Sequence, residues 1–128
     1  MIYVDTSVVL AHVFAEDRRP RDSFWEADLT SSRLLMYEVF TRAHARRITS
    51  KHLSFVREFV DRISFLELSH TVLERALEPL PVPVRTLDAL HLASMDYLRR
   101  LGTAVELASY DDRLLKAALT LGFAITPL

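Results

Sequence analysis

The chain contains no cysteine among its 128 residues. This absence excludes disulfide bonds, thiolate zinc sites and cysteine nucleophiles, so any bound metal ion must be held by oxygen or imidazole ligands. Glycine is also scarce, because only Gly102 and Gly122 are present. Neither belongs to a glycine-rich phosphate-binding loop, and we therefore do not expect a nucleotide-binding fold of that kind.

The sequence has no long hydrophobic run, although hydrophobic residues make up 50% of it. No apolar stretch approaches the roughly 20 residues that a membrane-spanning helix needs. The first residues lead directly into an expected strand rather than into a signal peptide. We therefore expect a cytoplasmic protein with no membrane partner.

A marked excess of charge is missing as well, since the formal net charge is −1. Nucleic-acid-binding proteins usually carry a visible cationic excess, which this composition does not provide. The cations are nevertheless clustered along the chain. The first cluster contains Arg18, Arg19 and Arg21, and the second contains Arg42, Arg46, Arg47 and Lys51. Taken singly, an arginine on an exposed helical face is usually only solvated.

The length and the mixed composition predict one folded domain over residues 1–128. Short apolar strands are expected at 2–4, 29–31, 64–68, 105–108 and 123–125. Helical segments are expected at 8–14, 22–27, 33–47, 50–63, 71–77, 86–101 and 111–121. Parallel neighbours need crossover connections, so the alternation predicts an α/β fold whose mostly parallel sheet of about five strands is flanked by helices.

Four acidic residues lie where a ligand site of such a sheet is expected. Ligands of open α/β sheets bind outside the carboxyl ends of the strands. Asp5 ends the first strand, and Asp111 follows the fourth strand after two intervening residues. Asp88 lies in the first turn of the helix that follows a proline-rich loop. Glu38 lies in an apolar helical stretch that leaves the second strand.

Each acid also has a purely structural role open to it. Asp88 and Asp111 can cap the helices that they begin, an interaction worth about 0.5–2 kcal/mol. Glu38 can form an ion pair with Arg42, four residues further along the helix. Capping is a weaker explanation for the strand-end aspartate, because the two hydroxyl residues that follow it can do that work.

The joint placement of the acids favours a cation site over four separate structural roles. Carboxylates gathered on one rim repel each other and shift each other's pKa unless a cation neutralises them. Carboxylate ligands without cysteine favour Mg²⁺ or Mn²⁺, which can bridge to a substrate phosphate. The predicted ligands are Asp5, Glu38, Asp88 and Asp111.

Four short motifs occur in order along essentially the whole chain. An apolar strand ending in Asp-Thr-Ser covers 2–7, and a Ser-x-Leu-like stretch leading to a Glu covers 32–39. An Asp-Ala-x-His-x-Ala helix covers 88–93, and a Ser-x-Asp follows a strand at 109–111. Together these motifs resemble the PIN-domain ribonucleases and, within that family, the VapC-type toxins of toxin–antitoxin pairs.

The resemblance implies a metal-dependent endoribonuclease that hydrolyses RNA phosphodiester bonds. The four acids named above would be its catalytic residues and its ligands for Mg²⁺ or Mn²⁺. The resemblance also implies a cognate antitoxin protein that covers the acidic cleft, and a homodimer. We choose Asp111 over the neighbouring Asp112 because it holds the position of the Thr/Ser-x-Asp motif. The choice of metal, the number of ions, the carboxylate that acts as base and the RNA target stay open.

Several neighbouring residues can support such a site. Thr6, Ser7 and Ser109 can orient the carboxylates through their hydroxyl groups, and the two arginine clusters would meet backbone phosphates. His91 lies three residues after Asp88 and invites a role as a ligand or proton carrier. On such an apolar helix we expect a packed, hydrogen-bonded histidine instead, and we leave it out of the site.

Two alternative functions use the same acids. Receiver domains and haloacid-dehalogenase-like phosphatases also place acids at strand ends, but the receiver pattern needs an Asp after the third strand and a Lys after a later one. The third strand leads here into Glu67-Leu68-Ser69, and Ser7 stands where the phosphatase pattern needs a second Asp. The other alternative is a non-catalytic binding module of PIN shape, which fold alone does not exclude. Retention of all four acids argues against it.

Overall fold

A parallel five-stranded sheet forms the centre of the protein in a computed structural model that describes residues Met1–Leu128. The strands are β1 (Ile2–Val4), β2 (Leu29–Ser32), β3 (Ser64–Leu66), β4 (Glu106–Ala108) and β5 (Ala124–Ile125). They pair in the order β3-β2-β1-β4-β5, and every pair is parallel. The expected α/β class is therefore confirmed.

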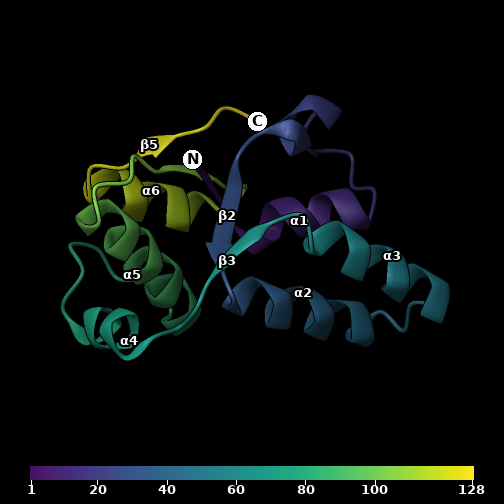
Figure 1. Cartoon of the computed structure of the whole chain (residues 1–128), viewed down its shortest axis with the longest axis horizontal. Coiled ribbons are helices and arrows are strands. Elements are labelled where there is room, and N and C mark those ends of the chain that lie inside the picture. The colour runs from purple at the N-terminus through teal and green to yellow at the C-terminus, as the bar shows by residue number, and fades with distance from the viewer.

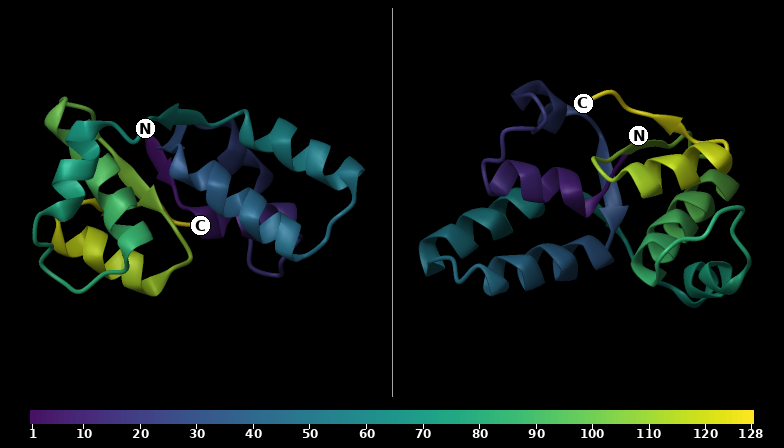
Figure 2. Two further views of the ribbon diagram at one scale, coloured as in Figure 1. Left: turned by 90° about the horizontal axis from the view of Figure 1, so that it is seen from below. Right: turned by 180° about the vertical axis from the view of Figure 1, so that it is seen from behind.

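Six α-helices and one 3₁₀ helix connect the strands. They are α1 (Thr6–Val13), η1 (Asp22–Glu26), α2 (Leu34–Ala45), α3 (Ser50–Val60), α4 (His70–Leu77), α5 (Thr86–Arg100) and α6 (Asp112–Thr120). Helices α1, α2 and α3 cover one face of the sheet, and α4, α5 and α6 lie on the other (Figures 1 and 2). None of the helices combines the length and the apolar composition needed to cross a bilayer.

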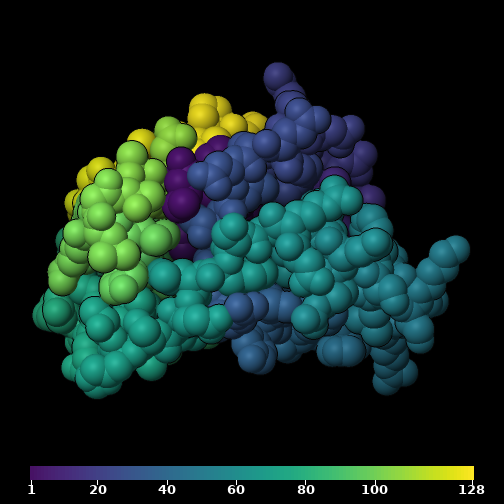
Figure 3. Space-filling view, in the orientation of Figure 1, coloured from purple at the N-terminus to yellow at the C-terminus, as the bar shows by residue number.

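A separate apolar core lies on each face of the sheet. Val4 packs with α1, α2 and α3 on one face, whereas Tyr3 packs with α5 and α6 on the other. Adjacent residues of a strand point to opposite faces, so a short β1 supplies both cores. Burial on both faces also explains why the strand is almost entirely apolar. The space-filling view shows the purple N-terminal residues at the surface between the green segment after α5 and the blue segment around β2 (Figure 3).

Polar residues and glycines set the ends of the helices near their expected positions. Thr49 caps α3 by accepting a hydrogen bond from the His52 N–H, and Ser69 caps α4 in the same way. Gly102 and Gly122 follow α5 and α6 with φ values of +88° and +85°, a conformation that terminates helices and favours glycine. The proline-rich loop remains non-helical, as expected.

The strand order places the expected ligand site at the junction of β1 and β4. From β1 the chain extends the sheet in one direction through β2 and β3, and in the other through β4 and β5. Such a switch in direction opens a crevice at the carboxyl ends of the two central strands. The register pairs Val4 with Ala108, so the residues that follow them emerge at the same edge.

Candidate active site

The four predicted acids line one hollow of about 440 Å³ at this edge of the sheet. Asp5 enters it from the end of β1, Glu38 from α2, Asp88 from α5 and Asp111 from the start of α6. We call this space the acidic hollow. The structure thus brings together side chains separated by more than a hundred residues, and the switch between β1 and β4 is the physical reason.

Asp5 is the best anchored of the four acids. Its Oδ2 atom accepts hydrogen bonds from the hydroxyls of Ser7 at 2.6 Å and Ser109 at 2.9 Å, and from the Ser7 N–H at 3.3 Å. This last bond makes Asp5 the N-cap of α1. Asp5 itself, and not the hydroxyl residues that follow it, therefore does the capping that we expected from Thr6 and Ser7. The Oδ1 atom accepts no hydrogen bond from the protein.

Glu38 is held by two donors from other elements. Its Oε1 atom accepts from the Thr6 hydroxyl at 2.9 Å and contacts His91 Nε2 at 2.6 Å. The ion pair with Arg42 that we offered as an alternative does not form, so that explanation of Glu38 is wrong. The side chain turns toward α1 and α5 instead of lying along its own helix.

His91 is fully packed and links the acidic hollow to the interior. Its Nδ1 atom lies 2.8 Å from the Tyr3 hydroxyl, which in turn accepts a hydrogen bond from the Ser32 N–H at 3.0 Å. Burial opposes protonation of the ring, but Tyr3 and the carboxylates of Glu38 and Asp5 outweigh it and raise the pKa of His91 to about 10. Since a carboxylate oxygen only accepts hydrogen bonds, His91 Nε2 donates to Glu38.

The expectation of a packed, hydrogen-bonded histidine is confirmed, but the sequence did not predict that Glu38 is its hydrogen-bond partner. His91 follows Asp88 by about one helical turn, so the sequence could place it on the same side of α5. No local pattern could show that it contacts Glu38, which is 53 residues away in the sequence. Packing of α2 against the sheet decides that contact.

Asp88 and Asp111 differ in how the protein holds them. Asp111 is the N-cap of α6, and its Oδ1 atom accepts from the N–H groups of Arg113 and Leu114. Asp88 caps nothing, because the N-cap of α5 is Arg85 and the Asp88 carboxylate makes no hydrogen bond with the protein. The capping alternative is therefore right for Asp111 and wrong for Asp88.

The electrostatic setting of Asp88 reports the proximity of the other acids. Burial raises the pKa of Asp88, and the negative charges of Asp111, Asp5 and Glu38 raise it further, against the opposing effect of His91. A cation in the hollow would relieve this repulsion. The raised pKa of Asp88 therefore reflects burial together with the negative charges of several carboxylates that face one space.

The acids do not form a ready-made ligand cage. No group of three or more His, Asp or Glu side chains is close enough to hold a metal ion as it stands. The donor chemistry nevertheless fits a hard divalent cation, because every acid keeps at least one carboxylate oxygen free of protein hydrogen bonds. These oxygens are Oδ1 of Asp5, Oε2 of Glu38, Oδ2 of Asp111 and both oxygens of Asp88.

Comparison with known proteins agrees with the fold and with the motifs. The model of the PIN domain family matches residues 2–119. This chain belongs to the PIN domain family. Ribonuclease VapC46 of Mycobacterium tuberculosis (strain ATCC 25618 / H37Rv) is 34% identical over 136 residues, covering 97% of this chain and 95% of the relative. Ribonuclease VapC47 of strain CDC 1551 / Oshkosh is 30% identical over 130 residues, covering 96% of this chain and 93% of the relative. The resemblance proposed from the four motifs is confirmed.

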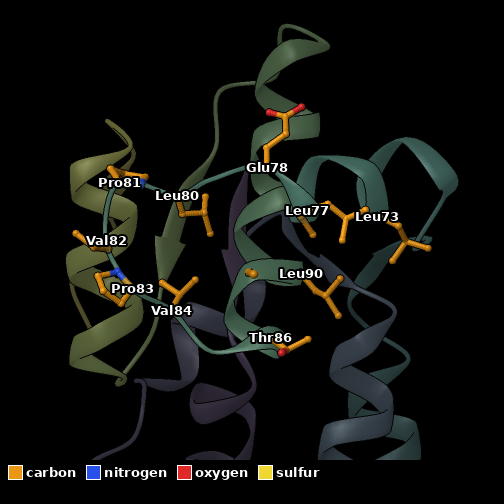
Figure 4. Close-up of a pocket in the computed structure, with 12 residues that line it drawn as sticks. Leu73, Leu77, Glu78, Leu80, Pro81, Val82, Pro83, Val84, Thr86 and Leu90 are labelled. Carbon is orange, nitrogen blue, oxygen red and sulfur yellow. The ribbon is translucent and has the colours of Figure 1, made fainter.

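A larger hollow of about 660 Å³ in this PIN domain lies apart from the acids. Helix α4, the proline-rich loop and the start of α5 enclose it, with apolar side chains such as Leu77, Leu80 and Leu90 along its wall (Figure 4). Its only ionisable lining residue is Glu78. One carboxylate cannot provide the paired acid–base or multiple-ligand chemistry of a nuclease, so the smaller acidic hollow is the candidate active site.

The PIN domain uses some of the predicted arginines for structure. Arg18 donates to the Tyr110 carbonyl at 2.9 Å and lies over the Tyr110 ring. Arg46 lies over the Phe14 ring and reaches Glu16 at 4.0 Å. Within the two clusters, only Arg42 lines the acidic hollow. The clusters seen in the sequence are therefore not gathered around the site.

Proposed function

We propose that this PIN domain is a divalent-cation-dependent endoribonuclease, the toxin of a toxin–antitoxin pair, which hydrolyses RNA phosphodiester bonds. The observation that carries the proposal is the acidic hollow, in which each of four carboxylates presents an oxygen that no protein donor occupies. Two relatives that align over nearly their full length are named ribonucleases, which supports RNA as the substrate.

The four acids would hold Mg²⁺ or Mn²⁺ between them. Bound there, the cation would polarise a phosphodiester oxygen, lower the pKa of water and stabilise the charge that develops at phosphorus. Ser7 and Ser109 occupy one oxygen of Asp5, which leaves its other oxygen available to the cation. Thr6 and His91 do the same for Glu38. A carboxylate of the set accepts the proton of the attacking water.

The structure gives the alternative phosphoryl-transfer function no support. A receiver domain needs a lysine beside its acids, and no lysine lines the acidic hollow. Ser7 donates to Asp5 and does not supply the second carboxylate of a dehalogenase-like phosphatase. A nuclease is thus the function that this set of side chains suits best.

Three further features follow from the family resemblance. We propose that a cognate antitoxin covers the acidic hollow, that the chain forms a homodimer, and that it acts in the cytoplasm. Light scattering of the purified protein would test the second point. A mass of twice 14.7 kDa is expected, and a single-chain mass would contradict it.

The function is tested by incubating purified protein with a pool of structured RNAs in Mg²⁺, in Mn²⁺ and in EDTA. We expect cutting with either metal, none in EDTA, and none from the Glu38→Gln variant. Asp112→Asn is the matched control, because Asp112 is exposed and does not line the hollow. Absence of cutting in every condition, together with absence of Mn²⁺ binding, would favour a non-catalytic binding module.

A further inference from the structure

The acidic hollow does not end at Asp88. A second hollow of about 470 Å³ shares Asp88 with it and continues along the outside of α6. Its wall is formed by the end of the proline-rich loop and by two residues of α6. The residues that line it are Val82, Pro83, Val84, Arg85, Asp88, Arg113 and Lys116. We call this second space the cationic groove.

Three cations of the groove are available to a ligand. Arg85, Arg113 and Lys116 are exposed, and none of them forms an ion pair or a side-chain hydrogen bond. Several other arginines are committed to the fold, as in the case of Arg75, which pairs with Asp96. The groove therefore presents positive charge that the protein itself does not use.

The arrangement on α6 is ordered by the helix. Arg113 and Lys116 are three residues apart and lie on one helical face. The backbone N–H of Arg113 is occupied by Asp111, so the helix start is fixed while the Arg113 side chain stays free. Arg85 approaches the same groove from the N-terminal end of α5. Loop and helix thus place their cations side by side.

The lining of the acidic hollow includes one cation as well. Arg42 of α2 lines the hollow without an ion pair. A polyanion that spans the two hollows would therefore meet Arg42 in addition to the cations of the groove. A net charge of −1 gives no long-range attraction, so local cations have to hold such a ligand.

We propose that the cationic groove binds the sugar–phosphate backbone of the RNA strand next to the cleaved bond, through Arg85, Arg113 and Lys116. This inference rests on the proposed nuclease function and adds the path of the substrate to it. Guanidinium and ammonium groups bind phosphate oxygens and fix the position of a strand without reading its bases. This path of the RNA strand differs from the one expected from the sequence, in which the two arginine clusters contact the phosphates.

The test compares two triple variants with the same loss of charge. The groove variant carries Arg85→Gln, Arg113→Gln and Lys116→Gln. The control variant carries Arg19→Gln, Arg47→Gln and Lys51→Gln, which remove cations of the two clusters noted in the sequence and so also test the rival path; the three positions are exposed, form no ion pair and line neither hollow. Both are placed in an Asp5→Asn background, and binding of a fluorescein-labelled single-stranded RNA is followed by anisotropy at several salt concentrations with Mg²⁺. Cleavage is measured in parallel without the Asp5→Asn change.

The groove variant is expected to bind the RNA about tenfold more weakly at low salt. Its plot of log affinity against log salt should flatten by about two, since each lost phosphate contact removes about 0.7 from the slope for a single strand. The control variant should keep wild-type affinity and slope within about twofold. Thermal melts of both variants should match the parent, because all six positions are exposed.

Three results would overturn the inference. The first is unchanged affinity and slope in the groove variant while the wild type cuts RNA, which would leave the nuclease function standing. The second is equal weakening of both variants, which would show a general charge effect. The third is unchanged RNA binding together with lost binding of poly-glutamate, which would assign the groove to an acidic protein segment. A wild type that neither binds nor cuts RNA would remove the proposed function itself.

Discussion

Neighbouring donors divide the oxygens of the four acids into two groups. Ser7 and Ser109 occupy one oxygen of Asp5, and Thr6 and His91 occupy one oxygen of Glu38. The N–H groups of Arg113 and Leu114 occupy one oxygen of Asp111, and the other carboxylate oxygens have no protein partner. Hydrogen bonds from fixed donors lower the freedom of a carboxylate, and this pre-orientation is what a metal site needs. His91 depends in turn on the Tyr3 hydroxyl behind it.

Tyr3→Phe tests the support behind His91. Tyr3 is fully buried, and its hydroxyl contacts both the Ser32 N–H and His91. Removing it leaves buried polar groups unpaired, so we expect a loss of about 1–3 kcal/mol in the free energy of unfolding. Urea denaturation measures this loss. Tyr37→Phe is the control, because Tyr37 is 68% exposed and its change should cost less than about 0.5 kcal/mol. Equal stability of the two variants would contradict the assigned hydrogen bonds.

Asp111 combines a cap with a proposed catalytic role, and two substitutions separate them. Asn caps helices about as well as Asp, whereas Ala costs about 1 kcal/mol. We expect Asp111→Asn to keep its stability and Asp111→Ala to lose about that amount in urea denaturation. Both variants should lose RNA cleavage, because both lack the carboxylate charge. If the Asp111→Asn variant cleaved RNA, Asp111 would act only as a helix cap.

At the scale of elements, α5 carries two acids with different purposes. Asp88 faces the acidic hollow, whereas Asp96 lies two turns further along and is buried among arginines. Arg75 of α4 donates to Asp96 at 2.8 Å, and Arg99 of α5 donates to it at 2.6 Å. Asp96 therefore ties α4 to α5, and does not belong to the site.

Asp96 makes stability depend on pH. Burial acts to raise the pKa of Asp96, but the hydrogen bonds from Arg75 and Arg99 and the charge of Arg100 outweigh it and lower the pKa. A group whose pKa is lowered on folding stabilises the fold above its unfolded pKa of about 3.9, and this contribution is lost as the pH falls through the folded value. Acidification below about pH 4 should therefore weaken the α4–α5 contact.

Asp96→Asn provides the measurement. At neutral pH the variant should unfold about 2 kcal/mol more easily in urea, because buried charged hydrogen bonds are lost. The difference from wild type should shrink as the pH falls below about 4, because the unfolded wild-type chain then takes up a proton that the folded carboxylate does not. Asp61→Asn is the matched control, since the Arg57–Asp61 pair is exposed and contributes less than about 1 kcal/mol. A difference that does not change with pH would contradict the lowered pKa.

The sequence predicts most of the elements but few of the contacts between them. Periodicity located every strand and helix to within a few residues, although the strand expected at 64–68 ends at Leu66. Hydrophobic spacing and capping are local properties, so the chain itself displays them. The strand order, the contact of His91 with Glu38 and the cationic groove depend on packing between distant segments. For that reason the sequence placed the acids at one edge but did not indicate the groove that Arg85, Arg113 and Lys116 line beside them.

At the scale of the whole molecule, two cores meet at β1, and the acidic hollow opens where both of them end. Helices α2 and α5 belong to different cores, yet they supply Glu38 and Asp88 to the same space. A ligand that joins the four acids therefore joins the two halves of the protein. Binding of a cation should consequently stabilise the whole fold.

Mg²⁺ or Mn²⁺ should raise the melting temperature of the wild type. A ligand that binds only the folded protein adds about 2.7 kcal/mol at a concentration of a hundred times its Kd. Calorimetric melts with and without the ion measure the effect, and a buffer that contains EDTA provides the metal-free baseline. Glu38→Gln should reduce the shift, whereas Asp112→Asn should retain it. A shift of equal size in all three proteins would place the cation elsewhere.

The most direct test of the central claim is the rate of RNA cleavage by four single variants in Mg²⁺ and in Mn²⁺. The variants are Asp5→Asn, Glu38→Gln, Asp88→Asn and Asp111→Asn, with Asp112→Asn as the control. Each change removes one charge at nearly constant shape, and we predict that each of the four lowers the rate by about 100-fold or more, while the control cuts at the wild-type rate. Wild-type rates in any of the four would contradict the account of a single four-carboxylate site.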